Sequence, residues 1–100
     1  MEQNPVCRRA VTVNLESGLH IRPMSQIAKI ANCFACELYI ISGGVSVDAK
    51  SVLELMTLNA PRGTVLIIEG NGEHAPEAVD RVAHLFEIDF ESENDETSDD

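Results

Sequence analysis

The chain has 100 residues, of which 17 are Asp or Glu and seven are Lys or Arg, giving a formal net charge of −10. Residues 87–100 hold eight of these acids and no basic residue, which leaves nine acids against seven basic residues elsewhere, a balance of −2. The length suits one domain, and 44% hydrophobic residues exclude wholesale disorder. Without a basic excess, the chain lacks the electrostatic footprint of a nucleic-acid-binding protein.

The sequence carries no sign of membrane insertion or export. No stretch approaches the roughly 20 apolar residues of a membrane span, and residues 1–5 lack the apolar segment of a signal peptide. Cys7, Cys33 and Cys36 are an odd number of cysteines, which argues against a complete disulfide framework. We therefore expect a cytoplasmic protein with reduced thiols, no direct membrane insertion and no nucleic-acid partner.

The first half of the chain alternates between strand and helix patterns. Residues 10–15 alternate apolar and polar side chains, which predicts a half-buried strand. Apolar residues then recur at helical spacing from Met24 to Phe34, which predicts an amphipathic helix of about three turns. The β-rich residues 38–41 and the alternation over 45–48 flank Ser42-Gly43-Gly44, which predicts a hairpin.

The second half continues with a short helix over residues 52–58 and a strand over 64–68 that is apolar on both faces, as in the interior of a sheet. Gly70-Asn71-Gly72 predicts a turn, and the apolar spacing over 79–86 predicts a last amphipathic helix with Pro76 in its first turn. The resulting order, β-α-β-β-α-β-α, predicts an α+β fold in which helices cover one face of a small antiparallel sheet.

The most informative segment, Ser17-Gly18-Leu19-His20-Ile21-Arg22-Pro23, lies between the first strand and the first helix. Gly18 can adopt an unusual backbone angle, and Pro23 stands where the helix begins. His20 and Arg22 are thereby placed beside the free N–H groups and the positive end of the helix dipole, which form an anion site. These surroundings favour the neutral, nucleophilic His20 ring. They predict reversible covalent phosphoryl transfer through His20, against the plainer reading of a surface or capping histidine.

This segment closely resembles the signature of HPr, the histidine-containing phosphocarrier family of the bacterial phosphotransferase system. A second block, Lys50-Ser51-Val52-Leu53-Glu54-Leu55-Met56-Thr57-Leu58, resembles the regulatory-serine helix of that family. The later Gly63-Thr64-Val65, the apolar strand and the final helix match in order and spacing, so the resemblance covers roughly residues 7–88. It implies an open-faced sandwich of a four-stranded antiparallel sheet covered on one face by three helices.

The resemblance implies that His20 accepts a phosphoryl group from enzyme I, charged by phosphoenolpyruvate, and passes it to enzyme IIA-type proteins in sugar phosphotransfer, without a cofactor. Arg22 would steady this group, and Ser17, Gly18 and Pro23 would frame it. Ser51 would be the substrate of an HPr kinase/phosphorylase, with a transcriptional regulator as a further partner. The protein would act as a monomer and a covalent intermediate, not as a free-standing catalyst. The alternative is a regulatory HPr-like protein in carbon or nitrogen control, without sugar transport.

The chain departs from the family pattern around this site. Ile21 and Met24 replace small alanines, and with Val52, Leu53 and Met56 they are the expected partner-docking residues, although the last three also fit a core. Asn59 replaces a common glycine, and we expect it to tolerate a left-handed turn. The acidic tail has no counterpart in the family. We predict an N-terminal extension at 1–6, an HPr-like domain at 7–88 and an acidic, disordered tail at 89–100.

Other candidate residues have plainer readings. Ser51 fits a helix N-cap, which does not exclude its phosphorylation. The pair Cys33 and Cys36 has no second pair to complete a zinc site and lies at a helix end, so we expect core or boundary cysteines and no metal. We expect His74 and His84 to lie at the surface.

Overall fold

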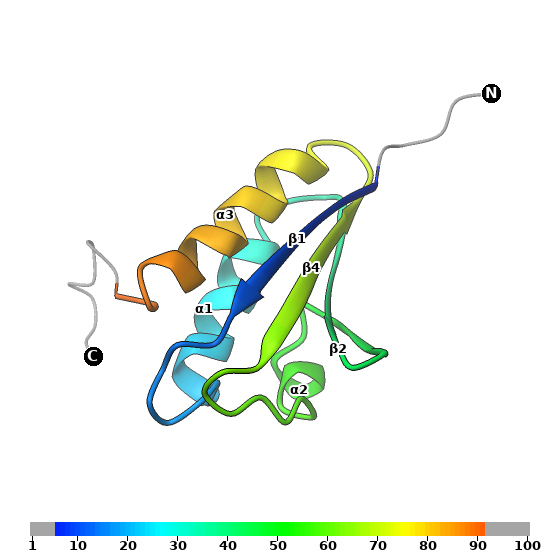
Figure 1. The fold of residues 1–100 in the computed structure, drawn as a ribbon. Helices are drawn as coiled ribbons and strands as arrows, with labels where there is room; N and C mark the ends of the chain where they lie inside the picture. The colour runs from blue at the N-terminus through cyan, green and yellow to red at the C-terminus, as the bar shows by residue number, and fades with distance from the viewer. Residues whose placement is uncertain (1–5, 92–100) are drawn as a thin grey trace.

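The computed structural model describes residues 6–91 and shows one antiparallel sheet with three helices on one side (Figure 1). The predicted fold class and element order are therefore confirmed. The described residues exclude 1–5 and 92–100, and the latter range is most of the predicted tail. The elements are β1 (Val6–Thr12), α1 (Ile21–Ala31), β2 (Glu37–Ser42), β3 (Val45–Asp48), α2 (Val52–Leu55), β4 (Val65–Asn71) and α3 (Ala75–Glu87).

The sheet has the strand order β1-β4-β2-β3, so β4 is an interior strand as its apolar sequence predicts. In its register Ile68 lies opposite Arg9 of β1 and Ile40 of β2. Leu66 and Ile68 are fully buried under the helices, whereas Val65 on the other face is 56% exposed. Residues 65–68 are therefore apolar on both faces of the sheet although only one face is covered.

The uncovered face of the sheet carries mixed side chains. Arg8 and Glu69, paired across β1 and β4, form an ion pair of 2.9 Å. On the neighbouring β2, the carboxylate of Glu37 raises the pKa of Tyr39 above its ordinary value. None of the helices of residues 6–91 has both the length and the apolar character that crossing a bilayer requires.

Amphipathic helices form the covered side. α1 buries Ile27 and Ala31 completely, and α3 buries Ala78, Val82 and Ala83. This is the 3.6-residue spacing read in the sequence, because one stripe of each helix faces the sheet. α1 ends three residues before Phe34, which the sequence pattern placed inside the helix. The Asn32 side chain donates to the Ala28 carbonyl at 2.8 Å and helps to end the helix there.

Glycines at the two predicted turns have different roles. Gly43 and Gly44, with φ of 55° and 88°, form the predicted hairpin turn, since both central residues need positive φ. Gly70 was expected in a turn but is buried inside β4. A Cβ there would lie 2.8 Å from Cγ2 of Val79, so this glycine allows α3 to approach the strand closely. The turn follows at Gly72.

The expectation of a left-handed turn at Asn59 is wrong. Within residues 6–91, the non-glycine residues with positive φ are His74, Asp89 and Phe90. α2 ends instead in ordinary right-handed residues, because the Leu58 N–H donates to the Leu55 carbonyl at 2.9 Å and tightens the last turn.

The folded unit extends past the predicted start of the tail. Phe90 is only 8% exposed and packs edge-on against Phe86, with 4.8 Å between the ring centroids. The Phe90 N–H donates to the Leu85 carbonyl at 2.7 Å, and the Gln26 side chain donates to the Phe90 carbonyl at 3.3 Å. A tail cannot therefore begin at residue 89, because Phe90 is part of the core.

Removing this ring has a measurable cost. We expect Phe90→Ala to lower the free energy of unfolding by about 2–3 kcal/mol, because it deletes a buried aromatic contact at the end of α3. Urea unfolding followed by circular dichroism measures the change. Chain truncation after Glu91 keeps the ring and serves as the control, with a midpoint equal to that of the full chain. Equal midpoints for Phe90→Ala and the full chain would show that this contact is not stabilising.

Candidate functional site

His20 is the N-cap residue of α1 and has an extended backbone, with φ of −116° and ψ of −171°. Its carbonyl accepts the first helical hydrogen bond, from the Met24 N–H at 3.1 Å. Its side chain makes no capping hydrogen bond and is exposed. The imidazole is therefore open to a reactant in solution, and the capping role that a histidine at this position can have is not used.

The start of α1 offers few but well-placed donors. The N–H groups of Ile21 and Arg22 precede the first intrahelical bond, and Pro23 has no N–H. Two backbone donors thus remain at the positive end of the helix dipole, next to the His20 ring. Arg22 is exposed and forms no ion pair with any residue of the described part. Two N–H groups and a guanidinium suit a doubly charged anion.

Gly18 fixes the loop that leads to the histidine. It has the predicted unusual conformation, with φ of 77°, and it is buried. A Cβ on this residue would lie 2.9 Å from the Ala60 oxygen and 3.0 Å from Cα of Pro61. The Leu19 N–H donates to the same Ala60 oxygen at 2.9 Å. The segment before His20 is therefore held against the loop between α2 and β4. Ser17 lies beside it with an exposed side chain.

The predicted docking residues divide into two groups. Ile21, Leu53 and Met56 are 53%, 78% and 53% exposed, and Val52 is half-buried. Met24, expected at the rim of the site, is only 4% exposed and packs in the core. It cannot offer a docking surface, because its position in α1 faces the sheet and not the solvent. α1 and α2 contact each other, and the side chain of Asn32, just after α1, donates to the carbonyl of Lys50, just before α2, at 3.1 Å.

Ser51 is the N-cap of α2, as one of its two readings predicts. Its Oγ accepts a hydrogen bond from the Glu54 N–H at 3.1 Å. The Glu54 carboxylate accepts from the Asp48 N–H at 2.9 Å, and the Asp48 carboxylate accepts from the Lys50 N–H at 2.9 Å. Ser51 thus lies between two acidic residues. The Lys50 ammonium donates to the Phe34 carbonyl at 2.7 Å.

Arg62 escaped the sequence reasoning. It lies in the loop between α2 and β4 and is exposed. This loop is the segment against which Gly18 and Leu19 pack, so Arg62 belongs to the same end of the molecule as His20. Nothing in the sequence near position 62 signals this, because tertiary contacts bring the two loops together.

The remaining candidates are two cysteines and two histidines. Cys36 is buried, as expected of a core cysteine, whereas Cys33 is exposed. Residues 6–91 contain no cluster of three or more His, Cys, Asp or Glu side chains placed to hold a metal ion. His74 and His84 are exposed, and each lies near an acid of α3, at 3.2 Å and 3.6 Å respectively.

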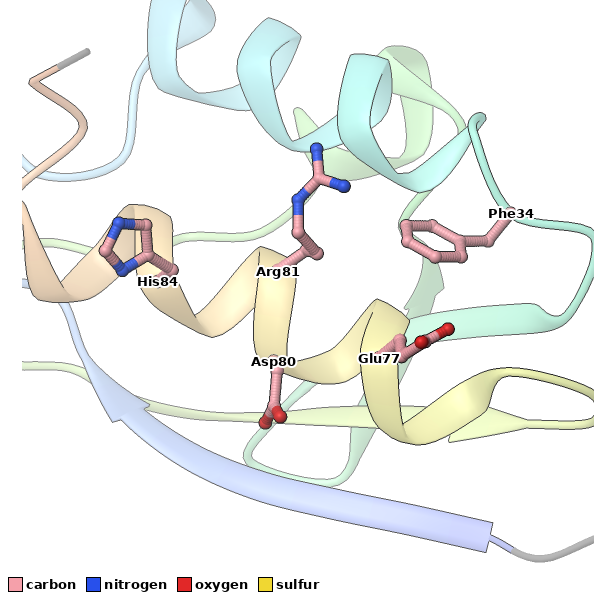
Figure 2. A pocket seen from close by; sticks show the side chains of 5 residues that line it. All are labelled: Phe34, Glu77, Asp80, Arg81 and His84. Carbon is pink, nitrogen blue, oxygen red and sulfur yellow. The ribbon is translucent and has the colours of Figure 1, made fainter. Parts of the chain in front are cut away.

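A hollow lies along α3, away from His20. Its lining residues are Phe34, Glu77, Asp80, Arg81 and His84 (Figure 2). The Arg81 guanidinium lies 5.8 Å from the centre of the Phe34 ring, and Asp80 points away to an ion pair with Arg9 of 2.7 Å. The contact of Arg81 with Phe34 and the ion pair of Asp80 with Arg9 tie α3 to its neighbours, whereas Glu77 and His84 lie near His74 and Glu87 on or beside α3 itself.

Comparisons with known proteins agree on one family. The family model described as "PTS HPr component phosphorylation site" matches residues 7–87. The phosphocarrier protein HPr of Vibrio cholerae is 38% identical over 79 residues, which cover 79% of this chain and 93% of that protein. The HPr-like protein Crh of Bacillus subtilis is 33% identical, covering 76% and 89%. The crystal structure of HPr from Bacillus anthracis superposes with a TM-score of 0.77 at 31% identity, covering 83% and 99%.

Proposed function

The chain belongs to the HPr family, the phosphocarriers of the phosphotransferase system, and we propose that His20 is the residue that carries its phosphoryl group. The donor is enzyme I, charged by phosphoenolpyruvate in the cytoplasm, and the acceptors are enzyme IIA-type proteins. The observation that carries this proposal is the exposed, uncapped ring of His20 at the start of α1.

The site supports a simple transfer. A nitrogen of the neutral ring attacks the phosphorus, a P–N bond forms, and the bond from phosphorus to the donor breaks with its electron pair remaining on the donor. The N–H groups of Ile21 and Arg22 and the Arg22 guanidinium stabilise the charge that arrives on His20. The next acceptor reverses these steps. Ser17, Gly18 and Pro23 have supporting roles, since they shape the loop and the first turn.

Exposed apolar side chains on α1 and α2 support docking of both partners. Ile21 on α1 and Leu53 and Met56 on α2 form this docking patch, with the half-buried Val52 at its edge. Exposed large apolar side chains grouped beside a reactive residue are typical of a protein–protein interface. A carrier has to be bound and released repeatedly, which suits a small patch of this kind.

Labelling tests the proposal directly. The protein is incubated with enzyme I and radioactive phosphoenolpyruvate, and the labelled residue is mapped by mass spectrometry at neutral pH. We expect one phosphoryl group per chain on His20, lost in acid and retained in base. Absence of label, an acid-stable label or label on another residue would each reject the assignment.

The second candidate function is regulation, in carbon or nitrogen control, through phosphorylation of Ser51 by an HPr kinase/phosphorylase and binding of a transcriptional regulator. The position of Ser51 at the positive end of α2, next to the exposed Leu53 and Met56, favours it. Similarity to a protein named HPr-like protein Crh also supports it. A genome that encodes an HPr kinase but no sugar permease components would select this function over transport.

In this proposal, the negative charge of Glu54 slows the phosphorylation of Ser51. A phosphate on Ser51 would meet the carboxylates of Glu54 and Asp48. We expect Glu54→Gln to raise the initial rate of Ser51 phosphorylation by HPr kinase about threefold, because it removes one like charge and keeps the hydrogen-bond acceptor. Glu73→Gln, at an exposed acid before α3, is the control. An unchanged or slower rate for Glu54→Gln would contradict this view of the site.

A further inference from the structure

Most basic side chains of residues 6–91 have partners away from His20. Arg8 pairs with Glu69, Arg9 pairs with Asp80 and Glu87, Lys50 donates to the Phe34 carbonyl, and Arg81 lies over the Phe34 ring. Within the described residues, the side chains of Arg22, Lys29 and Arg62 take part in no ion pair, no hydrogen bond and no contact with an aromatic ring. The segment between β1 and α1, residues 13–20, is called the histidine loop. Arg22 directly follows it in the first turn of α1, and Arg62 lies in the loop between α2 and β4 that packs against it.

The backbone on both sides of Arg62 is fixed to the histidine loop. Ala60, two residues before it, accepts the Leu19 N–H at 2.9 Å, and the Gly63 N–H, one residue after it, donates to the Val13 carbonyl at 2.8 Å. The Thr64 hydroxyl donates to the Pro61 carbonyl at 2.7 Å and closes the turn. Figure 1 shows the two loops side by side at the lower end of the molecule. Arg62 is thus an exposed cation on a rigid turn.

A protein that reaches the His20 ring has to cover this turn as well. A standard interface buries about 800 Å² on each partner, so a partner centred on His20 extends over the neighbouring loop of Arg62. An unpaired guanidinium presents a planar fork of N–H donors that matches a carboxylate. At the edge of an interface such a charge speeds encounter and fixes orientation more than it changes the reaction itself.

We propose that Arg62 is a docking residue for the phosphoryl donor, enzyme I, and binds a surface carboxylate of that partner, while Arg22 is left to the phosphoryl group. This inference rests on the proposed function. It assigns Arg22 and Arg62, which form no ion pair within residues 6–91, to two different tasks. Arg22 lies in the first turn of α1, two residues from His20, whereas Arg62 lies in another loop, whose backbone is hydrogen-bonded to the segment before His20.

Steady-state kinetics of the full chain with enzyme I and phosphoenolpyruvate test the division. We expect Arg62→Gln to raise the KM for the carrier about fivefold and Arg62→Glu to raise it further, with kcat within about twofold of wild type. Arg62→Lys keeps the charge and restores most of the loss. The dependence of KM on salt becomes shallower in Arg62→Gln, because one screened attraction is gone. The half-life of phospho-His20 stays unchanged.

Arg8→Gln is the matched control, because it removes the same charge on the open face of the sheet and leaves KM unchanged. A wild-type protein that takes no label would reject the proposed function and this inference together. Normal labelling of the wild type with an unchanged KM in Arg62→Gln would reject this inference alone. A fall in kcat or a shorter half-life of phospho-His20 without a rise in KM would also reject it, because Arg62 would then act on the phosphoryl group.

Discussion

Replacing His20 with Ala lowers incorporation of phosphate from phosphoenolpyruvate and enzyme I at least about a hundredfold, to background, because the substitution removes the attacking nitrogen. The stability of the variant stays close to that of wild type. The ring is exposed and makes no capping hydrogen bond, so little packing is lost with it. Radioactive labelling followed by gel autoradiography measures the first effect, and urea unfolding measures the second.

The two other histidines provide the controls. His84→Ala and His74→Asn alter exposed residues at α3, and Asn suits the positive φ of 65° at position 74. Both variants should be labelled at the wild-type rate. Substantial label in His20→Ala, or its loss in either control, would mean that a different histidine carries the group.

The second large effect concerns Gly18, two residues before His20. We expect Gly18→Ala to lower the free energy of unfolding by about 2–4 kcal/mol, because a side chain at φ of 77° is strained and its Cβ would meet the Ala60 oxygen at 2.9 Å. Because the obstacle is backbone, the loop of Ala60 has to move. The hydrogen bond from Leu19 to Ala60 is then weakened, and the rate of His20 labelling falls as well. Urea unfolding and single-turnover labelling measure the two effects.

Gly63→Ala separates the two causes. Gly63 has an even more positive φ of 94°, but no atom lies within 4 Å of the position of its Cβ. It should cost only the conformational part, about 1–2 kcal/mol, and should leave labelling unchanged. If Gly18→Ala costs no more than Gly63→Ala, the contact with Ala60 is not a constraint on the loop.

Features set by neighbouring residues could be predicted from the sequence. The apolar spacing of α1 and the Gly43-Gly44 turn depend on local geometry, and both are confirmed. Met24 and Gly70 show the limit of local patterns. Met24 directly follows the reactive segment in the sequence, yet its side chain is buried in the core. Gly70 lies in β4, and only a glycine fits there because Val79 of α3, nine residues further along the chain, packs against it.

The same distinction holds for the candidate site. His20 and Arg22 come from one continuous segment, so a short motif contains both. Arg62 joins them only because β1 and β4 pair and bring residues about fifty positions apart together, from Val13 to Thr64. Phe90 was assigned to the tail because the residues around it are acidic. That local composition gives no sign that Phe90 packs against Phe86.

The position of β4 in the centre of the sheet affects how the protein is made. β1 is synthesised first, but its strand partner consists of residues 65–71. Until these residues leave the ribosome, β1 has no partner, and the loop before His20 has no Ala60 oxygen to hold it. The β2–β3 hairpin can form earlier because its pairing is local. The loop that precedes His20, near the start of the chain, is therefore completed only after about three quarters of the chain has left the ribosome.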